Sequence, residues 1–71
     1  MKFSVIIHTI SKETFESDIS DEMELWKIEE IKNSMKQFKN FEYIEILIDN
    51  NPCYFHPDNI VMLSIKIHTK Y

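Results

Sequence analysis

Apolar and polar positions alternate along much of this chain, which is the pattern of β-strands. In residues 2–10 the alternation places Phe3, Val5 and Ile7 on one side of the first predicted strand. Three further segments share this pattern: residues 41–49, 53–56 and 60–69. Residues 11–19 are mostly polar and predict a connecting loop, or as an alternative a short extra strand around Phe15.

Between these strands the apolar spacing changes to that of a helix. Ser20 or Asp21 suits the N-cap, and Glu24 stands where a capping box led by Asp21 needs it. We therefore predict a helix from about Ser20 or Asp21 to about Phe38, with acidic residues near its start and lysines near its end. Its apolar residues form one stripe: Leu25, Ile28, Ile31, Met35 and Phe38.

These elements predict a single α+β domain over residues 1–71, in the order β-α-β-β-β. One amphipathic helix packs on a three- to four-stranded, mostly antiparallel sheet. The helix allows the first two strands to run parallel, and the last three form a meander. Residues 43–67 also resemble the closing strands of small barrels of the SH3-like or Sm-like kind, in which a short strand leads through one helical turn into the last strand. The resemblance implies nothing about activity.

The composition excludes several function classes. The 71 residues include no glycine and no arginine, so phosphate-binding loops and bidentate arginine contacts are absent. A net charge of −4 argues against direct binding of nucleic acid. This isoleucine- and lysine-rich composition resembles that of proteins from AT-rich genomes, including small phage and mobile-element proteins.

The cellular location of the protein is predicted from the targeting signals that the sequence lacks. The first ten residues, "MKFSVIIHTI", contain neither the apolar run nor the cleavage site of a signal peptide. No run reaches the roughly 18 apolar residues of a membrane span, and a single cysteine cannot form an internal disulfide. We therefore expect a cytoplasmic protein that does not contact a membrane.

The segment "NPCYFHPDNI", residues 51–60, raises the question of a metal site or a nucleophile. In an extended strand Cys53 and His56 point to opposite sides, and Pro57 favours that extension. A structural zinc would need about four Cys or His ligands, so a site shared between subunits is the one version left open. We predict a turn between two strands, and we expect no metal, no cofactor and no catalytic residue here.

The sequence offers few other candidate catalytic side chains. His8 and His68 could form an acid–base pair if neighbouring strands bring them together, and the alternative is two unrelated sheet histidines. Glu29 and Glu30 are adjacent on the helix and point in different directions, unlike the carboxylates of a glycosidase. We therefore predict that the protein is not an enzyme.

The helix offers a candidate protein-binding face. Met23 and Trp26 are three residues apart, on the side away from the apolar stripe. Polar residues surround them on that side, among them Glu22, Glu30 and Asn33. An apolar centre with a polar border is typical of an interaction hot spot. The alternative is that Trp26 packs under residues 11–19 against Phe15.

Negative charge gathers on the same region. Residues 18–30 contain six acids and one lysine, a net charge of −5, and the rest of the chain carries a net charge of +1. This stretch could steer the protein to a basic surface. The alternative is a solvated helix start that complements the helix dipole.

Two hypotheses for function follow. The first is a small, non-enzymatic, intracellular interaction protein, an inhibitor or adaptor that binds a larger protein with a basic surface. A phage or mobile-element protein with an anti-defence role, which blocks a host or defence protein, would suit the composition. The second is a homo-oligomer that sequesters a small ligand or nucleotide between subunits, since the first strand is apolar on both sides.

Overall fold

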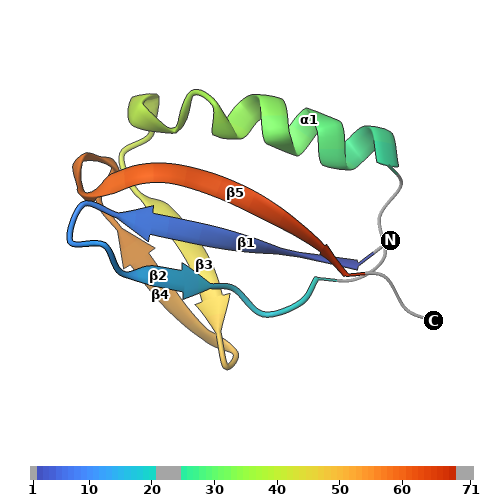
Figure 1. The fold of residues 1–71 in the computed structure, drawn as a ribbon, viewed down its shortest axis with the longest axis horizontal. Coiled ribbons are helices and arrows are strands. Elements are labelled where there is room, and N and C mark those ends of the chain that lie inside the picture. The colour runs from blue at the N-terminus through green and yellow to red at the C-terminus, as the bar shows by residue number, and fades with distance from the viewer. Residues whose placement is uncertain (1, 21–24, 69–71) are drawn as a thin grey trace.

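The computed structural model describes residues 2–20 and 25–68, and for residues 25–28 it describes the backbone alone. Within these ranges the chain forms five strands, one α-helix and two short 3₁₀ helices (Figure 1). In chain order they are β1 (Lys2–Thr9), β2 (Thr14–Glu16), α1 (Leu25–Met35), η1 (Phe38–Asn40), β3 (Ile44–Ile48), β4 (Asn51–Phe55), η2 (Pro57–Asn59) and β5 (Ile60–His68).

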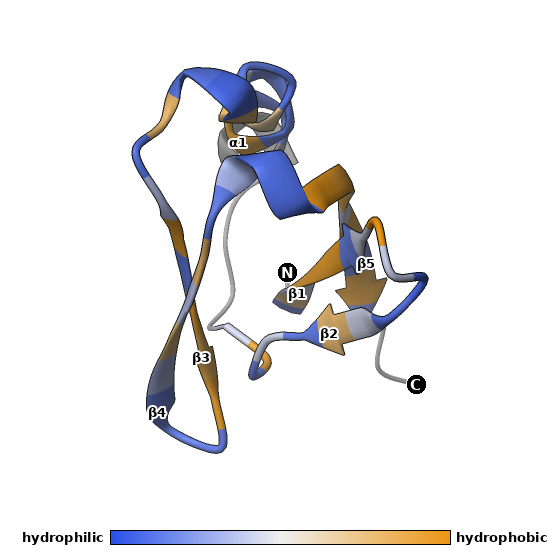
Figure 2. Ribbon diagram, turned by 90° about the vertical axis from the view of Figure 1, so that its left-hand side faces the viewer, coloured by the Kyte–Doolittle hydropathy of each residue, from blue (hydrophilic) through white to orange (hydrophobic). Residues whose placement is uncertain are grey.

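The strands form two layers. β1 is the middle strand of an antiparallel three-stranded sheet with the order β2-β1-β5, and β3 and β4 form a separate antiparallel hairpin. Seen from the side, the hairpin stands opposite one face of the sheet, and α1 lies above the space between the two layers (Figure 2). No described element covers the other face of the sheet (Figure 1).

The core lies between these layers, where alternate side chains of the sheet and the hairpin meet. Ile7 of β1 and Ile60 of β5 are 0% and 1% exposed, and Ile46 of β3 and Phe38 of η1 are also buried. Partly buried side chains surround them: Val5, Phe15, Ile44, Ile48, Cys53, Phe55 and Leu63. Complete burial of one isoleucine side chain contributes about 1.5–3 kcal/mol. The alternation in the sequence is therefore the pattern that builds this core.

The hairpin turns through a two-residue loop, Asp49–Asn50. Both residues have positive φ, at 52° and 64°. A two-residue hairpin loop with positive φ at both positions matches the right-handed twist of the flanking strands. Asparagine and aspartate tolerate this backbone region better than other residues with a Cβ atom, so this chain makes the turn without glycine.

Asp18 connects the segment after β2 to this loop. Its Oδ1 accepts a hydrogen bond from the N–H of Asp49 and its Oδ2 accepts one from the N–H of Asn50, both at 2.8 Å. The backbone N–H of Asp18 donates to the carbonyl oxygen of Leu47, also at 2.8 Å. These three bonds join the sheet layer to the hairpin layer.

The predicted α+β class, with one helix and mostly antiparallel strands, is confirmed. The structure has one strand more than the predicted order β-α-β-β-β, because β2 forms around Phe15, where the alternative interpretation placed a short strand. β2 pairs antiparallel with β1, with Ile7 opposite Phe15. A strand pair therefore precedes the helix. The first two predicted strands correspond to β1 and β3, which belong to different sheets, so the parallel pairing that the sequence allowed does not form.

The last strand also departs from the predicted meander. β5 pairs with β1 instead of β4, and Ile7 lies opposite Leu63 in this pairing. The single turn η2, which the resemblance to small barrels implied at this place, redirects the chain between β4 and β5. This route gives the apolar side of β1 a second apolar neighbour and closes the core against the hairpin.

α1 ends at Met35, three residues before the predicted limit at Phe38. Phe38 instead begins η1, and its side chain enters the core. Ile31 and Met35 are half-buried and Glu30 and Asn33 are exposed, so the described part of the helix is amphipathic as predicted. The predicted capping residues Asp21 and Glu24 lie outside the described residues.

Candidate interaction surface

The outer face of the β3–β4 hairpin points away from the core (Figure 2). Because side chains alternate along a strand, the inner isoleucines of β3 leave every second residue facing outward. The outward side chains define a surface that we call the hairpin surface: Tyr43, Glu45, Leu47, Pro52 and Tyr54. Tyr43, Leu47 and Tyr54 are 54%, 46% and 62% exposed, which makes this surface both apolar and accessible.

Two tyrosines form the centre of the hairpin surface. The rings of Tyr43 and Tyr54 meet edge to face, with centroids 5.4 Å apart and planes at 67°. Such aromatic pairs contribute about 0.5–1.5 kcal/mol beyond the area that they bury. The register of the β3–β4 pairing produces this contact. Tyr54 lies directly opposite Glu45, and Tyr43 is two residues before Glu45 on the same face, so the two rings are diagonal neighbours. The pair is therefore held in place before any partner binds, which lowers the entropy lost on binding.

The surroundings of the hairpin surface are acidic. Residues 41–55, which form the hairpin and the segment before it, include three carboxylates and no lysine, a charge of −3. All three carboxylates are exposed: Glu42, Glu45 and Asp49. An apolar centre with an acidic border suits a partner whose surface is apolar at the centre and basic around it.

The predicted protein-binding face on the helix is described only in part. Glu30 and Asn33 lie on α1 and are exposed. Glu22 and Met23 lie outside the described residues. Trp26 belongs to α1, but its side chain is outside the described part of the structure. The choice between an exposed Trp26 and a packed one therefore stays a prediction.

The prediction for residues 51–60 of a turn between two strands is confirmed, since β4, η2 and β5 follow one another there. Cys53 is half-buried and packs against the core, whereas His56 is exposed. The Nδ1 atom of His56 accepts the N–H of Asp58 at 3.1 Å and so caps η2. Among residues 2–20 and 25–68, no three His, Cys, Asp or Glu side chains form a group that could hold a metal ion.

The two histidines of the sheet are not brought together. His8 lies opposite Met62, at the other end of the β1–β5 ladder from His68, which lies opposite Lys2. Six residue positions separate them, about 20 Å at the rise of a strand. The acid–base pair is therefore not formed, and each histidine contacts a serine instead, His8 contacting Ser64 with Nε2 3.1 Å from Oγ.

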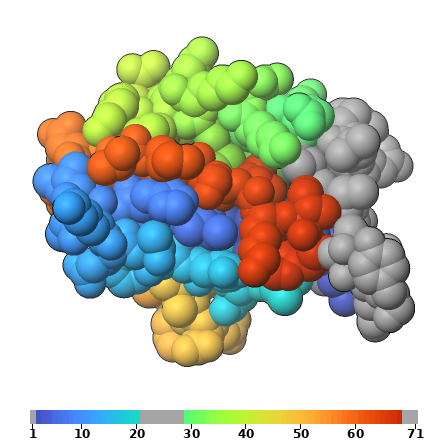
Figure 3. All heavy atoms as spheres, in the orientation of Figure 1, coloured from blue at the N-terminus to red at the C-terminus, as the bar shows by residue number. Residues whose placement is uncertain are grey.

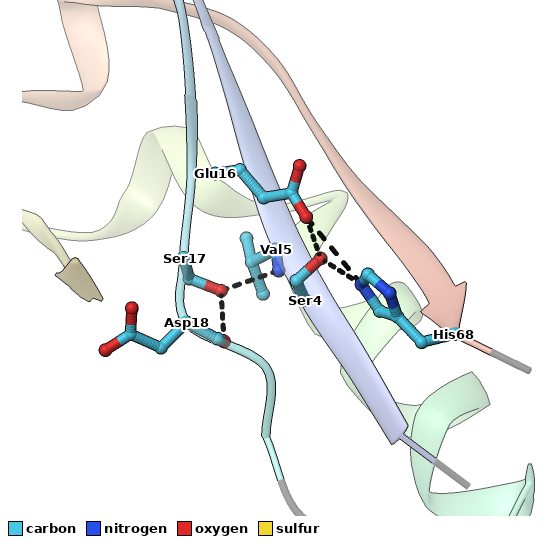
Figure 4. Close-up of polar contacts among 6 residues, drawn as sticks. All are labelled: Ser4, Val5, Glu16, Ser17, Asp18 and His68. Atoms are coloured by element: carbon cyan, nitrogen blue, oxygen red, sulfur yellow. Dashed lines mark hydrogen bonds and ion pairs between the residues drawn. The ribbon is translucent and has the colours of Figure 1, made fainter. Parts of the chain in front are cut away.

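Sequence reasoning missed a polar cluster of Ser4, Glu16 and His68 (Figure 4). The Ser4 hydroxyl donates to Oε2 of Glu16 at 2.7 Å. Its hydrogen is therefore used, so Nε2 of His68 is the donor in the second bond, to Oγ of Ser4 at 2.8 Å. The arrangement differs from a catalytic triad because the carboxylate and the imidazole both contact the serine. Ser4 is 0% exposed, so a substrate has no access to it. The cluster joins the three strands of the sheet.

Neither a protein-family model, nor a curated protein, nor a solved structure matches this chain. The chemistry of the described surfaces is therefore the basis for inferring function. Within the described ranges, no helix has both the length and the apolar composition needed to cross a membrane.

Proposed function

We propose that this chain is a non-enzymatic interaction protein, an inhibitor or adaptor that binds a larger protein through the hairpin surface. The observation that carries the proposal is the exposed pair Tyr43–Tyr54, fixed edge to face beside Leu47. Tyrosine is enriched among the residues that dominate binding energy at protein interfaces. Exposed apolar side chains that are contiguous and rimmed by polar residues are typical of protein interaction sites.

The charge pattern supports a partner with a basic surface. The carboxylates around the hairpin surface favour a partner that presents lysine or arginine around an apolar centre. Opposite charges at the border of an interface mainly raise the association rate. Salt at physiological concentration screens their attraction at separations beyond about 8–10 Å. We therefore expect association to slow as ionic strength rises, with a smaller effect on dissociation.

The acidic helix face enters the proposal as a second contact with the same partner. Glu30 and Asn33 are exposed on α1, and Trp26 is the apolar residue that we propose at the centre of that face. The single cysteine favours a cytoplasmic location. The composition fits a phage or mobile-element protein, and we propose that such a protein blocks a host or defence protein.

Affinity purification from the host, followed by native mass spectrometry, tests the proposal. The expected result is a larger protein that co-purifies with the wild-type chain and is lost from the double variant Tyr43→Ala/Tyr54→Ala. Ile10→Ala is the matched control, because Ile10 is also a large exposed apolar residue, 63% exposed, and lies in the turn after β1. Circular dichroism of each variant establishes that the fold is retained.

Two outcomes would contradict the proposal. If the partner stays bound to Tyr43→Ala/Tyr54→Ala, the hairpin surface is not the binding site. Loss of the same partner from Trp26→Ala or Glu30→Lys would then assign binding to the helix face. If the wild-type chain retains no larger protein and instead releases a small molecule on denaturation, the sequestering hypothesis replaces this one.

A further inference from the structure

β5 is an edge strand of the three-stranded sheet, and it has no strand on its outer side among the described elements. In an antiparallel pair, residues alternate between bonding the partner strand and pointing away from it. The carbonyl oxygen of Val5 accepts from the N–H of Ser17 at 2.8 Å, on the side of β1 away from β5. Val5 lies opposite Ile65, so the N–H and C=O of Ile65 point outward from the edge. Leu63, two positions earlier, points its backbone groups the same way.

A groove of about 450 Å³ lies between this outer edge and the helix. Leu63 and Ile65 line it from β5, and Met35 of α1 and Phe38 of η1 line it from the other side. Figure 3 shows the atoms of α1, in green, directly above those of β5, in orange and red. The volume falls within the range of natural ligand sites. The outward backbone groups of β5 therefore face an apolar space of useful size.

Lys32 and Lys36, one helical turn apart, also line the groove. Lys32 approaches Glu29 at 3.9 Å, and both side chains are well exposed, so this pair is weak. Lys36 forms no ion pair with any other described residue. The two ammonium groups give the groove a positive side, in contrast to the acidic hairpin surface.

We propose that this groove binds an extended segment of a partner protein by adding it as a strand to β5. The segment has apolar side chains at alternate positions, which lie against Met35, and an acidic side chain that faces Lys32 and Lys36. In strand addition, backbone hydrogen bonds supply affinity and pockets for alternate side chains supply specificity. The outward groups of Leu63 and Ile65 are the bonding positions.

The position of α1 argues against a second copy of this chain as the occupant. A copy paired through its own β5 would bring the rest of its sheet along, whereas α1 stands directly beside the edge as the second wall of the groove. A single extended segment needs no such space. The groove is separate from the hairpin surface, so the proposal does not depend on the function proposed above.

Hydrogen exchange measured by NMR tests whether the outward N–H groups of β5 are unbonded in the free chain. The amides of Leu63 and Ile65 are expected to exchange faster than that of Ser64, which bonds toward β1 opposite Ile6. Slow exchange at Leu63 and Ile65 in dilute protein would overturn the proposal, because these groups would already be bonded. Protection that appears only as concentration rises would also overturn it, since a second copy would then occupy the edge.

A titration with a synthetic peptide tests binding. The probe is acetyl-Thr-Val-Thr-Val-Thr-Glu-amide, compared with the same peptide ending in lysine and with a form N-methylated at both valines. The first peptide is expected to shift the amide signals of Leu63 and Ile65 and to slow their exchange. The lysine and N-methylated peptides are each expected to bind at least about tenfold more weakly, because one loses the carboxylate and the other loses backbone donors. Equal binding of the N-methylated form would refute strand addition.

Charge reversal on the helix completes the test. Lys32→Glu/Lys36→Glu is expected to weaken binding of the acidic peptide about tenfold and to improve binding of the lysine peptide. Lys2→Glu/Lys12→Glu makes the same change in net charge at positions outside the groove and outside β5, and it is expected to leave both affinities unchanged. Shifts that map to Tyr43 and Tyr54, or equal effects of the two double variants, would overturn the assignment of the groove.

Discussion

The two hydrogen bonds from the hairpin loop to Asp18 lead to a prediction about how the two layers stay together. Asp18→Ala removes the acceptor of the N–H groups of Asp49 and Asn50, each 2.8 Å from a carboxylate oxygen. A hydrogen bond to a charged group contributes about 1.5–3 kcal/mol when it is shielded from water. Here the loop is exposed, so water can replace the lost acceptor. We therefore expect the free energy of unfolding to fall by about 1–2 kcal/mol, well below the sum for two shielded bonds.

That loss is measurable by thermal unfolding followed by circular dichroism. In a domain of this size, each kcal/mol lowers Tm by about 4–8 °C, so Asp18→Ala is expected to lower Tm by roughly 5–15 °C. Asp18→Asn retains one acceptor oxygen and is expected to lose roughly half as much. The control is Glu42→Ala, which removes the same charge from an exposed side chain that makes no side-chain hydrogen bond or ion pair with another described residue.

The reasoning fails if Asp18→Ala unfolds at the temperature of the wild-type chain. It also fails if Glu42→Ala lowers Tm equally, since net charge and not the loop contact would then be the cause. Amide shifts of Asp49 and Asn50 distinguish the cases, because both signals should move in Asp18→Ala and stay in place in Glu42→Ala.

Three further predictions concern stability, each measured by urea unfolding. Ile7→Val is expected to lower the free energy of unfolding by about 0.5–1.5 kcal/mol, because Ile7 is 0% exposed. Ile10→Val, at an exposed position, is the control and is expected to change it little. Equal effects of the two variants would contradict the assigned core. Ser4→Ala removes the hydroxyl that joins three strands and is expected to cost about 1 kcal/mol, whereas an unchanged stability would show that the cluster is incidental. Asn50→Gly is expected to add about 0.5 kcal/mol, because glycine adopts positive φ without strain, and a loss would contradict the loop geometry.

Local pattern was sufficient for much of the fold. The alternation of Phe3, Val5 and Ile7 predicted a strand with a buried side; Phe3 and Ile7 are buried, and Val5 packs against the core cluster. The helix was found from its apolar period, although its end was placed three residues too late, because Phe38 fits the stripe equally well as the first residue of η1. β2 appeared only as an alternative, since three residues with one apolar side chain, Phe15, give little periodic signal.

The candidate sites could not be predicted because each depends on how strands pair, the hairpin surface on the register of β3 and β4 and the groove on the pairing of β1 with β5. Tyr43 and Tyr54 meet only once the Asp49–Asn50 loop has set the register of β3 and β4. The groove requires β5 to pair with β1, a partnership that joins the first strand to the last and has no local signature. The acidic charge near the helix start was visible in the sequence, but the sequence alone does not show that Glu45 lies opposite Tyr54 on the outer face of the hairpin.

The pairing of β1 with β5 has a consequence for synthesis on the ribosome. β1 is the central strand of its sheet, yet its longer partner is complete only when His68 has been added, 66 residues after Lys2. The β3–β4 hairpin is local and can close within microseconds of its emergence, whereas the chain grows at about 5–20 residues per second. For several seconds the nascent chain therefore presents the apolar side of β1 with only β2 beside it. A chaperone that binds extended apolar segments would have its main opportunity in that interval, and the native sheet would form only once β5 is available to pair with β1.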